Sequence, residues 1–199
     1  MPDSVPAWLA SSLGAPRPGH GKLTVARLAS EGMAGKGGFT IRSAAFRDGE
    51  ELDPSFTADE EDAVAPPLEW SAPPPGTQEL VLIVEDADAR EGKPASHWLV
   101  WGLAPQKGQL LEGEVPPRVG KNAFGNSEWL LPDPPTGETH HYVFQLFALD
   151  LPLVLMPGAS RAELEAAMEG HVLAVALTSG HYCREEGGDY DWDDEDEGD

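Results

Sequence analysis

The chain has 199 residues, 40% of them hydrophobic, which suffices for a single domain whose core needs no disulfide bonds. Its net charge of −22 at pH 7 excludes electrostatic attraction to nucleic acids and anionic membranes, but not to basic proteins. Cys183 is the single cysteine, and no signal-peptide pattern or bilayer-spanning apolar stretch is present. We therefore expect a cytoplasmic protein without stable membrane insertion.

Residues 1–38 are predicted to be an N-terminal extension with one short helix. The helix spans residues 4–13, and Ser4 is its expected N-cap. Its apolar side chains are Trp8, Leu9 and Leu13. Because so short a helix is not stable alone in water, the body of the protein or a second copy must cover it, and we expect a homodimer. The glycines of residues 15–38 indicate a loop or linker.

From residue 39 onward the sequence predicts β-structure. The strand-like segments are residues 39–43, 80–84, 98–103 and 142–149. Residues 80–84 are apolar throughout, which indicates a strand buried on both faces. Because turns rather than helices separate the strands, we expect an antiparallel β-sandwich over residues 39–184, with a few peripheral helices.

Two acids and a histidine lie at the ends of neighbouring predicted strands. Asp86 and Asp88 follow the buried strand, and His97 stands at the start of the next one. Acids two positions apart on an extended chain point to one side, so they could meet the imidazole at one small mouth. The alternative is that the acids are turn residues that bond backbone amides, and that His97 is merely half-buried.

A third strand end supplies two more polar groups. A Pro/Gly-rich turn precedes the segment H-H-Y-V-F at residues 140–144. The period of two along a strand puts His140 and Tyr142 on one face, at the end of an apolar row. These two side chains are therefore candidates for the same site.

A helix is predicted near the C-terminus. Ser160 and Glu163 have the spacing of a capping box, and apolar residues follow at helical intervals. His171 falls on that apolar stripe, where packing is favoured over ligand binding. Alternatively, a helix break at Gly170 would make residues 174–178 a final strand.

The last segment, residues 185–199, has only acids among its charged side chains. It lacks the apolar residues that would offset the entropy of ordering, so we expect a disordered acidic tail. Tyr190 and Trp192 could form a linear motif for a basic partner, but a solvating tail is favoured.

The chain also carries several short motifs. They are A-P-P-L-E-W at residues 65–70, D-A-D-A-R at 86–90, H-W-L-V at 97–100, G-K-N-A-F-G at 120–125 and P-P-T-G-E-T-H-H-Y-V-F at 134–144. In this order they resemble the phosphatidylethanolamine-binding protein family, in its bacterial Raf-kinase-inhibitor-like branch. The resemblance covers roughly residues 39–182 and implies the same β-sandwich.

What the resemblance implies is a small pocket for a phosphate-like anion. The matching positions are Asp86, Asp88, His97, His140 and Tyr142. The imidazoles and the hydroxyl can donate hydrogen bonds to anion oxygens. The carboxylates would orient the imidazoles, bond an amine or hydroxyl of the ligand, or share a proton with the anion.

The sequence departs from the family's pattern around this pocket. The family's D-P-D-A-P loop has lost both prolines here, which predicts a less rigid loop after Asp86. Leu131 stands where the family usually has a glycine, so its side chain should narrow the pocket or change its ligand. Ala123 replaces the aspartate of the family's N-D-F-G motif.

We expect a non-enzymatic binding protein that uses no cofactor. The sequence has no zinc-type Cys/His spacing, no phosphate-binding glycine loop and no G-x-S-x-G motif. Two alternatives stay open. One is a metal-assisted hydrolase that uses the Asp/His group, and the other is a protein-interaction module that inhibits a kinase or protease.

Overall fold

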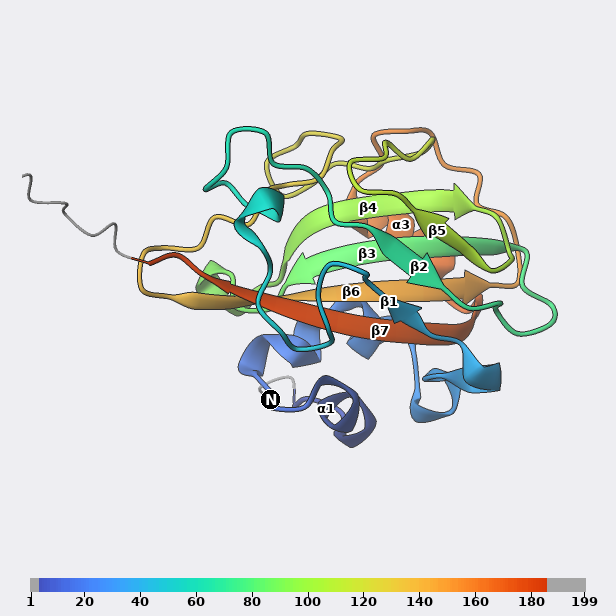
Figure 1. The fold of residues 1–199 in the computed structure, drawn as a ribbon. Coiled ribbons are helices and arrows are strands. Elements are labelled where there is room, and N and C mark those ends of the chain that lie inside the picture. The colour runs from blue at the N-terminus through green and yellow to red at the C-terminus, as the bar shows by residue number, and fades with distance from the viewer. Residues whose placement is uncertain (1–3, 186–199) are drawn as a thin grey trace, which may run out of the picture.

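The computed structural model describes residues 4–185 as two packed antiparallel sheets and a layer of helices (Figure 1). The small sheet has the order β1-β2-β5, with strands Ile41–Arg42, Leu68–Trp70 and Gly108–Leu110. The large sheet has the order β4-β3-β6-β7, with strands Ala95–Leu103, Glu79–Asp86, Thr139–Leu149 and Val172–Cys183. The predicted antiparallel sandwich is confirmed.

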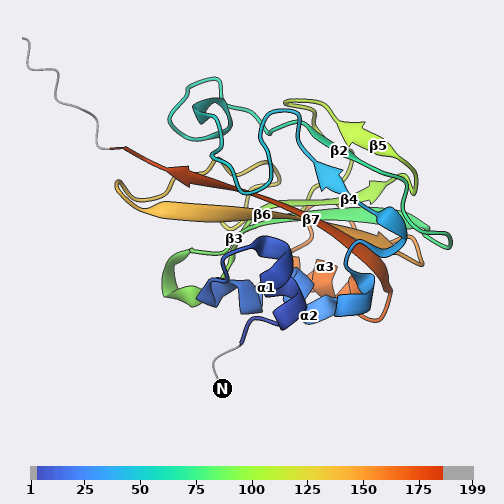
Figure 2. The ribbon, with the colours of Figure 1, turned by 60° about the horizontal axis from the view of Figure 1, so that its bottom comes forward.

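The helices are short and lie outside the sandwich. They are α1 (Ala7–Leu13), α2 (Thr24–Leu28) and α3 (Arg161–Met168), and the 3-10 helices η1 (Pro18–Lys22), η2 (Glu31–Met33), η3 (Lys36–Gly38), η4 (Pro54–Phe56) and η5 (Arg90–Gly92). Figure 2 shows the three α-helices on the face of the large sheet opposite β2 and β5. Among residues 4–185, no helix is both long and apolar enough to cross a membrane.

The large sheet separates two hydrophobic cores, so β3, one of its two inner strands, is buried on both faces. Leu82 and Val84 point into the core between the two sheets. Val81 and Ile83 point into the core beneath the helices. The alternation follows from the period of two along a strand, and it confirms the prediction of a strand buried on both faces.

The N-terminal helix packs against its own chain. Leu9 is fully buried beneath the helices, and Trp8 and Leu13 pack against the same core. Because Pro6 keeps an extended ψ of 140°, α1 begins only after it, and the prediction of Ser4 as the N-cap is wrong. The apolar face is covered in cis, so it no longer gives a reason for the homodimer that we predicted.

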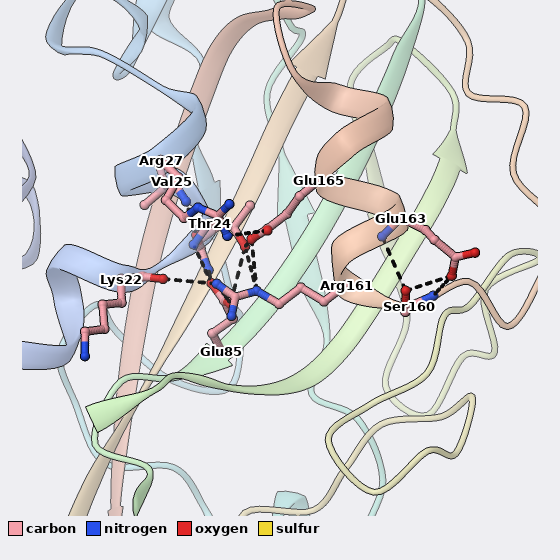
Figure 3. Close-up of polar contacts among 10 residues, drawn as sticks. Lys22, Thr24, Val25, Arg27, Glu85, Ser160, Arg161, Glu163 and Glu165 are labelled. Carbon is pink, nitrogen blue, oxygen red and sulfur yellow. Dashed lines mark hydrogen bonds and ion pairs between the residues drawn. The ribbon is translucent and has the colours of Figure 1, made fainter. Parts of the chain in front are cut away.

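Residues 15–38 contain α2 and 3-10 turns, where the sequence indicated a plain loop. The cause is tertiary, since the backbone amides of Thr24 and Val25 donate at 2.8 Å to the side chains of Glu85 and Gln145. Arg161 of α3 joins this cluster, with Nη2 2.7 Å from Glu85 Oε1 (Figure 3). Partners so distant in sequence override local propensity.

The C-terminal helix begins as predicted and ends earlier. At its start the Ser160 hydroxyl accepts from the Glu163 amide at 3.3 Å, which completes a capping box. It ends before Gly170, whose φ is 79°, and the alternative of a final strand is confirmed as β7. His171 therefore leaves the predicted helical stripe and pairs with Asp150 at 2.9 Å. The predicted tail lies outside the described residues from residue 186 onward.

Loops cover the free edges of both outer strands of the large sheet. Along β7, the amides of Gly35 and Leu52 donate to strand carbonyls at 2.9 and 2.8 Å. Along β4, the amides of Gly120 and Leu130 do the same at 2.8 and 2.9 Å. The loop along β4 thereby becomes the wall of a cavity at the end of β3.

Candidate functional site

The ends of three neighbouring strands meet beside a cavity of about 290 Å³. Asp86, the last residue of β3, is paired with Ala95 of β4 and with Tyr142 of β6. This register brings His97 of β4 and His140 of β6 to the same end of the sheet. The cavity is lined by Asp86, His97, His140 and Tyr142, and by Ala89, Arg90, Ala95, Ala123, Phe124, Leu130, Leu131, Asp133 and Pro135.

A buried pair, His140 and Asp86, supplies the first polar groups. His140 Nδ1 lies 2.7 Å from Asp86 Oδ2, with both side chains under a tenth exposed. Because an ionised carboxylate only accepts hydrogen bonds, Nδ1 carries a proton and Nε2 is left for other partners. The nearest carboxylate to Nε2 is that of the exposed Glu138, at 3.5 Å.

His97 is held in the same way, by a backbone carbonyl. Its Nδ1 donates to the Leu130 carbonyl at 2.7 Å, so Nε2 is an acceptor in the neutral ring. Burial lowers the pKa of His97 below its ordinary value, although the Leu130 carbonyl and the Asp86 charge act in the opposite direction. His97 is therefore neutral at pH 7.

Tyr142 completes the set. Its ring meets the His97 ring edge-on, with a centroid separation of 5.0 Å. Burial raises the pKa of the Tyr142 hydroxyl, and the charges of Asp86 and Asp133 raise it further. The hydroxyl thus keeps its proton and can donate a hydrogen bond at the cavity.

Asp88 lies outside this cavity, so the prediction that both acids point to one side is wrong. The strand ends at Asp86, and the Asp88 amide turns back to donate to Asp86 Oδ1 at 2.8 Å. The Asp88 carboxylate instead contacts the His141 ring at 2.8 Å and Arg17 at 3.2 Å. Burial would raise the pKa of Asp88, but these partners hold it below its ordinary value. The Asp88 carboxylate therefore connects the loop after β3 to Arg17 of the N-terminal segment.

Sequence reasoning missed several groups at the cavity. The Leu130 carbonyl, which orients His97, could not be found because a backbone atom carries no residue-type signal. Arg90 lines the cavity and stands where the family has its second proline, so that departure was a usable signal. Phe124 also lines it, with 78% of its surface exposed, and an exposed aromatic residue cannot be recognised from periodicity alone.

A metal centre was one of the open alternatives. Within residues 4–185, no three or more His, Cys, Asp or Glu side chains are grouped so that they could hold a metal ion. The imidazole of His140 and the carboxylate of Asp86 are bonded to each other. This part of the chain therefore contains no cluster of metal ligands that would support the alternative of a metal-assisted hydrolase.

Comparison with known sequences decides the family. Residues 42–183 match the sequence model described as phosphatidylethanolamine-binding protein. The chain belongs to the phosphatidylethanolamine-binding protein family. A UPF0098 protein of Aquifex aeolicus is 39% identical over 153 residues, which are 73% of this chain and 88% of the relative. A UPF0098 protein of Pyrococcus horikoshii is 38% identical over 151 residues, or 71% and 75% of the two chains.

Solved structures from this family agree with the fold. A phosphatidylethanolamine-binding protein homologue from Chlamydia trachomatis gives a TM-score of 0.69 at 33% identity, covering 74% of this chain and 98% of that one. The Escherichia coli family member YbcL gives 0.66 at 26% identity, covering 73% and 98%. The family match begins at residue 42, so the N-terminal segment that contacts Glu85 precedes it.

Three departures from the family's pattern lie on the cavity itself, and one of them is Arg90, described above. Leu131 and Ala123 also line the cavity, and the Ala123 amide donates to β4 at 2.8 Å. The loop after Asp86 lacks the family's prolines, yet it is closed by the turn at Asp88 and by a 2.9 Å bond from the Ala87 amide to β6. Leu131 and Ala123 therefore change the side chains on the wall of the cavity relative to the family's pattern.

Proposed function

We propose that this family member is a non-enzymatic binding protein whose cavity takes a small phosphate-type anion. The proposed ligand-binding groups are Asp86, His97, His140 and Tyr142, without Asp88. The proposal is supported above all by the two imidazoles, since an acceptor of the fold holds each Nδ1 and leaves each Nε2 to a ligand. The proposed location is the cytoplasm, because Cys183 has no second cysteine to pair with.

The charge of the site determines how it would bind an anion. With both rings neutral, each Nε2 is an acceptor. The carboxylates of Asp86 and Asp133 repel a dianion, and Arg90, which also lines the cavity, attracts it. Hydrogen phosphate brings an O–H that can donate to His97 Nε2. His140, beside Asp86, can take up a proton and then donate to the anion. The anion therefore binds together with at least one proton.

The proton coupling gives the direction of the pH dependence. Bound anion favours the imidazolium form, so affinity for phosphate should rise as the pH falls from about 8 to about 6. The rise is at most about tenfold per pH unit for each coupled proton. Isothermal titration calorimetry with inorganic phosphate at several pH values measures it.

Sulfate and two matched histidine variants sharpen this experiment. Sulfate carries no proton near neutrality, so it should bind more weakly than phosphate. His140→Gln should lower both the affinity and its pH slope, because glutamine keeps a donor but cannot become charged. His171→Gln is the control, since that exposed histidine also pairs with a carboxylate, Asp150, but lies outside the cavity. A measurable affinity that stays flat with pH in all three proteins would refute the proposed site.

The absence of turnover is a separate prediction. Among residues 4–185, the lining of the cavity adds no Ser, Thr, Cys or Lys nucleophile to the four proposed groups, so we expect no hydrolysis of ester, phosphoester or peptide substrates. Chromogenic esters and phosphoesters, assayed with and without added divalent metal, test this. A rate that disappears in His97→Ala and depends on the added metal would favour the hydrolase instead.

A further inference from the structure

A second, larger cavity adjoins the proposed anion pocket. It is a groove of about 510 Å³, lined by three loops and by Trp98 of β4. Two of its apolar side chains, Val115 and Phe124, are 85% and 78% exposed. Side chains of this kind are normally scattered singly over a protein surface, so their presence on one concave site indicates a binding surface.

The walls of the groove are held by bonds within the fold. The Trp129 indole donates to the Phe56 carbonyl at 3.2 Å and stacks on Phe144, with ring centroids 6.1 Å apart. On the opposite loop, the Val64 amide donates to the Ser55 carbonyl at 3.0 Å. The groove is thus formed before any occupant arrives, which reduces the entropy lost on binding.

The groove is negative as well as apolar. Its charged lining residues are the acids Glu114, Glu128 and Asp133, and no Lys or Arg is among the residues that line it. Arg184 reaches Asp133, but its guanidinium is shared with Asp59. An occupant therefore meets apolar surface bordered by an excess of negative charge.

We propose that this groove docks a peptide segment of a partner protein in which large apolar side chains are flanked by lysine or arginine. Contact with Val115, Phe124 and Trp129 supplies affinity, and the acids select positively charged flanks and speed association. The chain's own residues 186–199 are a poor occupant, because they carry acids and no base. The same negative charge disfavours an anionic membrane.

Docking of a peptide in the groove should change the affinity of the neighbouring anion pocket. The two cavities share Phe124, Leu130, Leu131 and Asp133. A peptide seated in the groove covers this common wall, so the affinity for phosphate should change when the peptide is bound. The docking does not rest on the proposed anion function, and phosphate-free buffer tests it alone.

The test uses the full chain and a fluorescein-labelled peptide with central leucines flanked by arginines. Its fluorescence anisotropy should rise on binding, and the affinity should fall as salt is raised from roughly 0.05 M to roughly 0.5 M. Two matched peptides should fail to bind. One has glutamates in place of the arginines, and the other has serines in place of the leucines.

Paired variants of the protein locate the binding surface. The double variant Val115→Ser, Phe124→Ser should lower the affinity for the peptide by at least about tenfold. The double variant Glu114→Lys, Glu128→Lys should lower the affinity and make it less dependent on salt. The control is Val154→Ser with Met156→Ser, because these side chains are 98% and 81% exposed and lie outside the groove. All the substituted positions are exposed, and circular dichroism verifies that the variants fold.

Three results would overturn the proposal. The first is an absence of binding by the leucine–arginine peptide, and the second is binding that the groove and control variants weaken equally. The third is binding of the chain to neutral or anionic phospholipid vesicles that only the groove variants abolish, which would assign the groove to a lipid surface.

Discussion

Glu85 and Asp86 are adjacent carboxylates at the end of β3, yet they face opposite sides of the large sheet. Glu85 is completely buried, accepts hydrogen bonds from Thr24 and forms an ion pair with Arg161 of α3 (Figure 3). It also accepts a hydrogen bond from Gln145. Asp86 accepts from the His140 ring and lines a cavity. A carboxylate whose acceptor sites are filled by the fold holds structure together, whereas one beside a cavity is available to a ligand.

The largest expected effect belongs to Glu85. Burial raises the pKa of Glu85, and Arg161, Gln145 and Thr24 counteract that effect by stabilising its charge. Glu85→Ala removes the acceptor from these partners and should lower the free energy of unfolding by about 3–5 kcal/mol. Urea denaturation followed by tryptophan fluorescence measures the loss, and the phosphate affinity of the folded variant should equal that of the wild type.

The matched variant is Asp86→Ala. It should lower phosphate affinity by roughly tenfold, because His140 loses both its acceptor and the negative charge that favours its protonated form, and this loss outweighs the relief of repulsion between Asp86 and the anion. It should cost less stability than Glu85→Ala, since the hydrogen bonds that Asp86 accepts within residues 4–185 come from its own loop and its own sheet. Equal losses of stability in the two variants would erase the distinction between the carboxylates.

A smaller loss of stability is expected from a substitution in the N-terminal segment, which packs on the same face of the large sheet as Glu85. A Cβ atom added at Gly19 would lie 1.7 Å from the Ala87 carbonyl oxygen, so one of the two backbones must move. Gly19→Ala should destabilise the protein by about 1–3 kcal/mol. Gly32→Ala, where a Cβ meets nothing within 4 Å, is the control and should be nearly neutral in the same urea titration.

The pH dependence of stability tests the Asp86 side. Because burial lowers the pKa of His97, the unfolded chain binds a proton below about pH 6.5 that folded His97 does not. The contribution of His97 to stability is full above that pH and is lost as the pH falls below it, by at most about 1.4 kcal/mol per pH unit.

His97→Gln keeps a donor for the Leu130 carbonyl but cannot titrate. Between roughly pH 7.5 and roughly pH 5.5, this variant should lose less stability than the wild type, as measured by urea denaturation at both pH values. A steeper loss in the variant would mean that folded His97 is protonated.

The smallest effect concerns the shape of the pocket. Leu131→Ala should widen the cavity and raise the affinity for phenyl phosphate relative to inorganic phosphate by roughly threefold, or about 0.7 kcal/mol. Competition calorimetry measures the ratio, and the exposed Val154→Ala serves as the control. An unchanged ratio would show that Leu131 does not limit the size of the ligand.

Local patterns in the sequence predicted the strands because periodicity reports which face is buried. The buried run at residues 80–84, the row that contains His140 and Tyr142, and the capping box at Ser160 all belong to elements found in the structure. The strand ends already suggested that Asp86, His97 and His140 could converge, with a turn as the alternative. The family resemblance was needed to favour convergence, since the order of the strands in a sheet is not visible in a single sequence.

Hydrogen bonding between residues distant in sequence explains why α2 was missed. The side chains of Glu85 and Gln145 fix α2 by accepting from its backbone amides, and no local pattern predicts such partners. Asp88 was misplaced because a turn, not an extended chain, follows Asp86. A buried acid inside an apolar strand was the overlooked signal, because it requires donors from another part of the chain.

The loops along β4 and β7 also determine how this protein can meet other molecules. Exposed strand edges recruit strands from other chains, and this recruitment is a common route to fibrils. Amides such as those of Leu52 and Leu130 already occupy the carbonyls of the outer strands, which hinders strand addition at these edges. Recognition must then be carried by side chains, so evolution can change what the surface binds by substituting loop residues while the sheet stays intact.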